Sequence, residues 1–231
     1  MEYNTFSMKG KGFFIIVDGP SASGKDTIIK QILKDLRGLG IKVITIEETK
    51  EKSYDRKKIL TAKQHGDQEL VKVIINERNK LYQKTVIPQL LAGTFVIANR
   101  GEPTTLGYQT LKQKPTMESV WNSHRKQGIP LPNLIVIANC SVDEAIRREN
   151  LRKPSFEEKD KSFMSGKFTP LYSQKEELKK RKLIHANYEN VKNFLNKKGL
   201  NVIYINTDSM DVPKACRRIV SFIKKISMLL R

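Results

Sequence analysis

Several features are scarce in this 231-residue chain, and each shortage excludes a class of protein. The two cysteines, Cys140 and Cys216, are too few for a disulfide framework or a cysteine metal cluster. No run of about 18 apolar residues occurs, so the sequence predicts no membrane-spanning helix. The first residues lack the long apolar run of a secretory signal. We therefore expect a cytoplasmic protein whose cysteines are reduced.

Negative charge is also scarce relative to positive charge. The chain has 43 Lys and Arg against 24 Asp and Glu, which gives a formal net charge of +19. Such an excess favours anionic partners, either nucleotides or nucleic acids. The lysines are spread along the whole chain, however, and neither an aromatic RNA-binding motif nor an internal repeat is present. We predict a nucleotide partner, with nucleic acid as the alternative that steeply salt-dependent binding would indicate.

Apolar runs alternate with segments of helical spacing, a pattern that predicts an α/β fold with a parallel sheet. The predicted strands are 13–18, 41–46, 94–98, 134–138 and 202–205. The predicted helices are 25–37, 52–64, 67–91 with a break near Pro88, a short one around 104–109, 117–126, one from Ser141 to about Arg152, 174–197 and 212–230. The length favours one domain, 1–231, in which the polar segment from about 149 to 173 forms a mobile lid.

The stretch from Asp18 to Thr27 lies between the first predicted strand and the first predicted helix. The spacing from Gly19 to Gly24 and Lys25 is that of the Walker A pattern. Glycines let the backbone approach phosphate oxygens, and the amides at the helix start favour an anion. Lys25 adds a positive charge for the outer phosphates. We predict that ATP is bound by Gly19, Pro20, Ser21, Ala22, Ser23, Gly24, Lys25, Asp26 and Thr27.

Arginines lie at the ends of two other predicted elements. They suit phosphoryl transfer, which depends mainly on positioning and charge neutralisation. Arg100 follows the third strand and can hold an acceptor phosphate in a bidentate contact. Arg148 and Arg152 are four residues apart and share a helix face, from which they can close over the reacting group. Magnesium needs oxygen ligands, and we predict Thr27, with Asp18 or Asp26 behind it.

Residues 19–27 resemble the phosphate loop of nucleoside monophosphate kinases, and three further segments resemble the thymidylate kinase family of these enzymes. Residues 96–109 read Val-Ile-Ala-Asn-Arg-Gly-Glu-Pro-Thr-Thr-Leu-Gly-Tyr-Gln. This run is similar to the family signature in which Asp-Arg-Tyr is followed by Ser/Thr and then Ala-Tyr-Gln. Residues 75–78, Ile-Asn-Glu-Arg, resemble the helix that presents an arginine to the nucleotide, and 132–148 resemble the strand and helix that lead into an arginine-rich lid. The resemblance covers nearly the whole chain in the same order.

The resemblance implies a three-layer P-loop kinase fold with a five-stranded parallel sheet. It implies ATP-dependent phosphorylation of dTMP to dTDP with Mg²⁺, by a homodimer. It further implies that Tyr188 belongs to the site and that Asn206 and Thr207 lie near the donor adenine. The catalytic residues would be Lys25, Arg100, Arg148 and Arg152, the metal-side residues Thr27 and Asp18, and the acceptor-binding residues Arg78, Arg100, Thr104, Thr105, Tyr108 and Gln109.

The sequence departs from the family pattern at several places. Asn99 stands where the family has Asp, Ser21 where it commonly has Asp, and Asp26 where it has Ser or Thr. Ile74 replaces an aromatic residue, and Glu-Glu-Thr-Lys at 47–50 replaces an Arg-Glu-Pro run. The Gly-Pro-Ser start of the loop is closer to cytidylate kinase. A kinase for another deoxynucleotide or a deoxynucleoside, and an inactive nucleotide-binding module, therefore remain alternatives.

Overall fold

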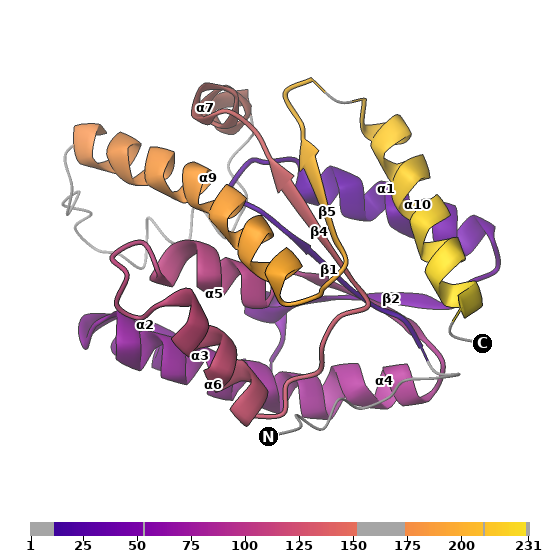
Figure 1. Ribbon diagram of the computed structural model, residues 1–231, viewed down its shortest axis with the longest axis horizontal. Coiled ribbons are helices and arrows are strands. Elements are labelled where there is room, and N and C mark those ends of the chain that lie inside the picture. Colours follow the sequence, from indigo (N-terminus) through magenta and orange to yellow (C-terminus); the bar gives the residue numbers. More distant parts are fainter. Residues whose placement is uncertain (1–11, 53, 152–173, 210, 230–231) are drawn as a thin grey trace.

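The computed structural model describes residues 12–52, 54–151, 174–209 and 211–229. A parallel sheet of five strands in the order β2-β3-β1-β4-β5 lies at its centre, between layers of helices (Figure 1). The strands are β1 Phe14–Asp18, β2 Val43–Glu47, β3 Phe95–Asn99, β4 Leu134–Asn139 and β5 Val202–Asn206. The predicted α/β class and parallel sheet are confirmed, and every strand lies within two residues of its predicted bounds.

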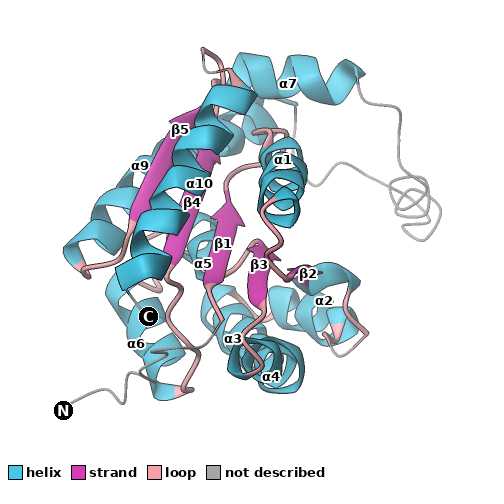
Figure 2. Ribbon diagram, turned by 90° about the vertical axis from the view of Figure 1, so that its right-hand side faces the viewer, coloured by secondary structure: helices cyan, strands magenta, loops and turns pink. Residues whose placement is uncertain are grey.

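The helices form a layer on each face of the sheet. α1 and α10 pack on one face, while α3, α4, α5, α6 and α9 cover the other (Figures 1 and 2). No helix in the described ranges is both long and apolar enough to cross a bilayer. The bounds are α1 Lys25–Gly38, α2 Arg56–Gln64, α3 Asp67–Leu81, α4 Ile87–Leu91, α5 Glu102–Gln109, α6 Met117–Lys126, α7 Val142–Leu151, α9 Gln174–Lys197 and α10 Val212–Leu229.

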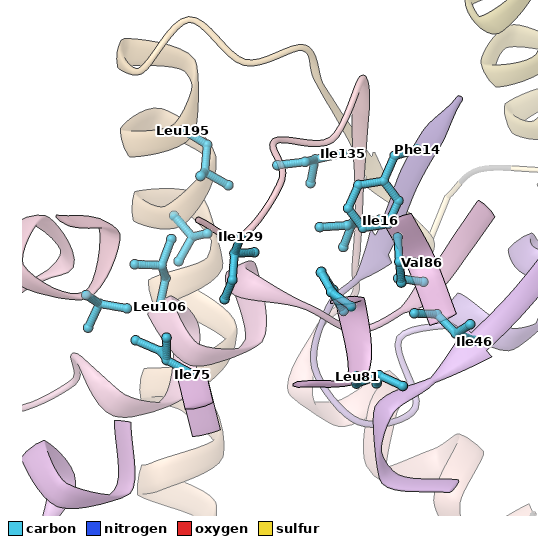
Figure 3. Packing of buried hydrophobic residues seen from close by; sticks show 14 of the residues in the cluster. Phe14, Ile16, Ile46, Ile75, Leu81, Val86, Leu106, Ile129, Ile135 and Leu195 are labelled. Atoms are coloured by element: carbon cyan, nitrogen blue, oxygen red, sulfur yellow. The ribbon is translucent and has the colours of Figure 1, made fainter. Parts of the chain in front are cut away.

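Strand β1 shows why a continuous apolar run is needed at the centre of the sheet. All five of its residues are buried. Successive side chains of a strand point to opposite faces, so Phe14 and Ile16 enter one apolar cluster while Ile15 and Val17 enter the other. Figure 3 shows the first cluster, to which strands β1, β2 and β4 and helices α3, α5 and α9 contribute. A strand buried on both faces cannot alternate apolar with polar residues.

The helix predicted for 52–64 begins later than expected, at Arg56. Its start is fixed by Asp55, whose carboxylate accepts hydrogen bonds from the N–H groups of Lys57 and Lys58 at 3.0 and 3.2 Å. An aspartate at this position satisfies N–H groups that the first helical turn leaves unpaired. The Asp55 cap therefore determines where α2 begins, and the charged residues before it do not extend the helix.

The long helix predicted for 67–91 is divided rather than kinked at its proline. A π-helical turn, Tyr82–Val86, separates α3 from α4. Pro88 lies in the first turn of α4, where its missing N–H is tolerated. The irregularity is thus present as predicted, but it lies in the wider turn that precedes the proline.

The carboxyl ends of the parallel strands meet at one edge of the sheet. The strand register pairs Val17 of β1 with Asn99 of β3, and Asn99 with Glu47 of β2. The segments that follow these three strands therefore begin side by side. Open α/β sheets bind their ligands at this edge.

Two leucines test the assignment of the α1 layer. We expect Leu36→Ala to lower the free energy of unfolding by about 2–5 kcal/mol, because the fully buried side chain leaves a cavity. The matched control Leu60→Ala, on α2 and 63% exposed, should change it by less than about 0.5 kcal/mol. Urea denaturation followed by circular dichroism measures both, and equal losses would contradict the layer assignment.

Candidate functional site

A buried carboxylate at the end of β1 joins the segments of the site. Asp18 is fully buried, and its two oxygens accept hydrogen bonds from the N–H groups of Gly19, Gly101 and Thr104 at 2.7, 3.0 and 2.9 Å. The hydroxyl of Thr104 donates at 2.7 Å and that of Tyr188 at 2.9 Å. These contacts fasten the loop after β1 to the start of α5 and to α9. The magnesium-side role predicted for Asp18 would require at least one of them to break.

The backbone of the predicted phosphate loop needs glycine at its first position. Gly19 has φ +146°, and a Cβ there would lie 1.9 Å from the carbonyl oxygen of Ala138. Gly24 has φ +86° and Ala22 has φ 56°, so the loop turns through the left-handed region twice. Gly24 is the residue before α1 and supplies no side-chain cap. The first N–H groups of α1 are therefore available to an anion.

Lys25 lies across this loop at the first position of α1. Its side chain is 6% exposed, and the Nζ donates to the carbonyl oxygen of Pro20 at 2.8 Å. Burial, together with the positive charge of Arg100, lowers the pKa of Lys25 to about 8. A buried ammonium group with a lowered pKa gains from a nearby anion. The structure therefore shows a cation held at the mouth of a loop of amides.

Arg148 on α7 lies behind the same loop. Its guanidinium donates to the carbonyl oxygen of Ala22 at 3.3 Å and to the hydroxyl and carbonyl oxygens of Thr207 at 2.9 and 2.8 Å. The Thr207 hydroxyl in turn donates to the carbonyl oxygen of Ser23 at 3.1 Å. Arg148 thus ties the loop to Thr207, which directly follows β5 and is one of the two residues predicted near the donor adenine. Its closure over the reacting group stays a prediction.

Other parts of the predicted lid lie outside the described residues. Arg152 is among these, and of the segment 149–173 the structure describes 149–151. At the start of α7, Ser141 caps the helix as expected, because its hydroxyl accepts from the N–H of Glu144 at 3.2 Å. The Glu144 carboxylate pairs with Arg147 and Arg148 rather than returning to the cap.

Arg100 and Tyr108 also lie close to Asp18, whose negative charge contributes to the raised pKa of each. Arg100 has φ 75° and its N–H donates to the carbonyl oxygen of Val17 at 3.0 Å, which fixes the turn after β3 beside β1. Burial lowers the pKa of Arg100, but Tyr108 and Asp18 outweigh burial and the pKa is raised overall. Tyr108 packs edge-on against Tyr188, with ring centroids 6.3 Å apart. The structure therefore brings Arg100 and Tyr108 together, as predicted for the acceptor site.

The remaining acceptor residues predicted on α5 have different surroundings. Thr104 is bound to Asp18, and the hydroxyl of Thr105 is buried against Arg78. Gln109 is half-buried at the end of α5. Thr104 and Thr105 thus hold other site residues, and a direct contact of either with a nucleotide stays a prediction.

Arg78 is more buried than its predicted role suggests. The side chain is 1% exposed, and its guanidinium makes a bidentate ion pair with Glu48 at 2.5 and 2.9 Å. It also donates to the Thr105 hydroxyl at 3.0 Å, to the Gly101 carbonyl oxygen at 2.9 Å and to Nε2 of His124 at 2.6 Å. Contact between Arg78 and an acceptor base would require this network to rearrange.

Oxygen ligands for a magnesium ion gather where α1 begins. Asp26 and Thr27 are exposed there, and Asp26 Oδ1 lies 3.0 Å from the Asn99 amide nitrogen. Asn99 Oδ1 is buried and has no hydrogen-bond partner within the described residues. Magnesium prefers such oxygens and keeps phosphate and water ligands as well. The donor set therefore fits the ion, although no group of three or more His, Cys, Asp or Glu in the described ranges could hold a metal by itself.

Two partners of the predicted residues escaped the sequence analysis. Glu48 was noted only as part of the 47–50 segment that departs from the family pattern, and His124 was assigned no role. Nδ1 of His124 lies 2.9 Å from the carbonyl oxygen of Val120, so its Nε2 is free to accept from Arg78. The separations of 30 and 46 residues from Arg78 leave no local signal for either contact.

Comparisons with known proteins agree with this arrangement. The family model described as thymidylate kinase matches residues 17–198. Thymidylate kinases from two serovars of Leptospira interrogans, copenhageni and Lai, are each 25% identical to this chain over 146 residues. The aligned part is 62% of this chain and 71% of each relative. The region matched by the family model includes the phosphate loop, Arg100 and Arg148.

A pair of arginine substitutions measures what the buried ion pair contributes. We expect Arg78→Met to lower the free energy of unfolding by about 3–5 kcal/mol, because the buried Glu48 carboxylate loses its counter-charge. The control Arg181→Met removes a half-exposed pair with Glu149 and should cost less than about 1 kcal/mol. Urea denaturation measures both, and a loss for Arg78→Met as small as that of the control would show that the network is dispensable.

Proposed function

Because the chain belongs to the thymidylate kinase family, we propose that it transfers the terminal phosphate of ATP to dTMP and so forms dTDP. The observation that carries this proposal is the position of two cations close to Asp18, whose negative charge acts on both. Lys25 lies on the phosphate loop after β1, and Arg100 follows the neighbouring strand β3. The positive charge of Arg100 contributes to the lowered pKa of Lys25, so the two groups are close enough for their charges to interact. Such a pair suits two phosphate groups that must approach each other.

In the proposed reaction, an oxygen of the acceptor phosphate forms a bond to the γ-phosphorus while the bond to the β-phosphate oxygen breaks and ADP leaves. The amides of the loop and Lys25 would neutralise the donor phosphates, and Arg100 would hold the acceptor phosphate. Arg148 would keep the loop in position through Ala22 and Thr207. With Arg152, it would complete the closed site.

Three further points are part of the proposal. Magnesium, held by oxygen ligands where α1 begins, would neutralise charge on the nucleotide phosphates. The protein would act as a homodimer, as the family resemblance implies, and light scattering at working concentration tests this point. A cytoplasmic location agrees with Cys140 and Cys216, which are both buried and free.

The acceptor base is the least determined part, and a kinase for another deoxynucleotide is the second candidate. The observation in its favour is the buried Arg78, whose donors are occupied by Glu48, Thr105 and other protein groups. Ile74, half-buried one turn before Arg78, provides no aromatic ring for stacking. Both residues lie where the resemblance predicts contacts with thymine.

A panel of acceptors tests the proposed function. ADP release from ATP is measured in a coupled assay with the monophosphates dTMP, dUMP, dCMP, dGMP and dAMP, and with thymidine. We expect the highest kcat/KM with dTMP. A preference for another monophosphate supports the second candidate, whereas ATP binding without turnover on any acceptor would establish an inactive module.

Two variants link this activity to the site. Arg100→Gln should lower kcat/KM by roughly 100-fold or more, because the charge on the acceptor phosphate is no longer neutralised. Arg37→Gln, which changes an exposed arginine in the last turn of α1, is the matched control and should retain wild-type activity. Wild-type activity in Arg100→Gln contradicts the assigned role.

The lowered pKa of Lys25 predicts how ATP affinity depends on pH. Only the protonated ammonium group attracts phosphates, and in the free protein this proton is lost as pH rises through about 8. ATP affinity should therefore be constant below that pH and fall above it by up to about tenfold per unit, with proton uptake on binding. Calorimetric titration in two buffers measures both quantities. Lys25→Arg should give a flat profile over the same range, and a flat wild-type profile would contradict the assignment.

A further inference from the structure

Three polar side chains from separate elements meet where α1 begins. Asp26 belongs to the first turn of α1, Asn99 ends β3 and Glu47 ends β2. The Asn99 amide nitrogen lies 3.0 Å from Asp26 Oδ1 and 3.5 Å from Glu47 Oε2. The other amide atom, Asn99 Oδ1, is buried without a partner in the described part of the chain. The amide thus turns its donor to the two carboxylates and leaves an acceptor oxygen beside them.

This contact relates two departures of the sequence from the family pattern. After the loop lysine, the Walker A pattern has a Ser or Thr whose hydroxyl binds Mg²⁺, and this chain has Asp26. Before the strand-end arginine, the resembling signature has Asp, and this chain has Asn99. The carboxylate and the neutral group have therefore exchanged places across a single hydrogen bond. The number of carboxylates that these two positions contribute is unchanged.

We propose that Asp26 provides the carboxylate ligand of the nucleotide-bound magnesium ion and that Asn99 is the positioning residue that holds it. This inference rests on the proposed function and assigns the metal side of the same site. It displaces the two residues predicted from the sequence alone. Asp18 is committed to the buried contacts of the loop and α5, and Thr27 lies one residue, about 100° of helix turn, away from Asp26.

A carboxylate at position 26 has an electrostatic consequence that the usual Ser or Thr hydroxyl at this position would not produce. Without metal, the negative charge of Asp26 stands near the donor phosphates and repels them. With Mg²⁺ bound, the same charge is a ligand and favours the nucleotide complex. The charge of Asp26 already acts on Lys25, whose pKa it raises against the larger effect of burial. Asp26 should therefore oppose nucleotide binding in chelator and support it in Mg²⁺.

The test measures ADP affinity by calorimetry, in EDTA and in Mg²⁺, for the wild type and its variants. We expect Mg²⁺ to tighten wild-type binding at least about tenfold, as one charge acting on the phosphates at protein-like dielectric allows. Asp26→Asn should bind ADP more tightly than the wild type in EDTA and lose most of the Mg²⁺ enhancement. Electron paramagnetic resonance of Mn²⁺ with ADP should show weaker retention of the metal by this variant.

Two further variants test whether the effect on Mg²⁺ enhancement is specific to the Asp26 and Asn99 pair. The double variant Asp26→Ser/Asn99→Asp returns the carboxylate to the strand end and should recover the Mg²⁺ enhancement that Asp26→Ser loses. Asp35→Asn, on the same α1 helix and hydrogen-bonded to Gln31, should behave as the wild type. Thermal denaturation confirms that each variant is folded.

The outcomes separate this inference from the proposed function. Full Mg²⁺ enhancement in Asp26→Asn, or no recovery in the double variant, overturns the assignment of Asp26 while leaving the kinase proposal intact. A wild type that binds no ADP in either condition overturns the proposed function itself. The assignment is supported if Asp26 weakens ADP binding in EDTA and strengthens it in Mg²⁺, and if the double variant Asp26→Ser/Asn99→Asp recovers the Mg²⁺ enhancement.

Discussion

The organisation of the site depends on the burial of one carboxylate. Asp18 is fully enclosed, and an ionised group in that position is tolerated only if its oxygens are hydrogen-bonded. Donors come from the loop that follows, from the start of α5 and from Tyr188 on α9. The phosphate loop and the Arg100 turn are therefore held to the same two oxygens. A movement of either segment would therefore change the hydrogen bonds of Asp18 that hold the other segment.

A buried ion pair supports the proposed acceptor side in a similar way. Arg78 joins the end of β2, through Glu48, to the carbonyl oxygen of Gly101 at the turn after β3. Because Gly101 also donates its N–H to Asp18, the two buried charges share one peptide segment. Arg100, the residue before Gly101, is thus fixed from both sides while its own side chain remains half-buried. A rigid support of this kind suits the role proposed for Arg100, which is to hold a phosphate in one orientation.

The sequence alone predicted the structure correctly where neighbouring residues determine it. The apolar run of β1 and the glycines of the loop predicted their structures, because burial on both faces and positive φ restrict which residues fit. The start of α2 was missed, because a single cap determines it. The break in the predicted helix 67–91 was expected, but it lies before Pro88 because a π-helical turn determines its position. The partners of Arg78 could not be predicted either, because residues 30 and 46 positions away are brought to it only by the fold.

The pair of Asp26 and Asn99 shows that a sequence motif specifies charge and oxygen atoms at a place in the fold. Taken position by position, each residue is a mismatch, and together they suggest a weakened metal site. Their side chains nevertheless lie 3.0 Å apart, so the local charge is the same whichever of the two bears it. A metal ion bound with phosphates responds to the charge and oxygen atoms around it, whichever element of the fold supplies them. The spatial arrangement of charge is therefore the sounder basis for comparing this loop with its relatives.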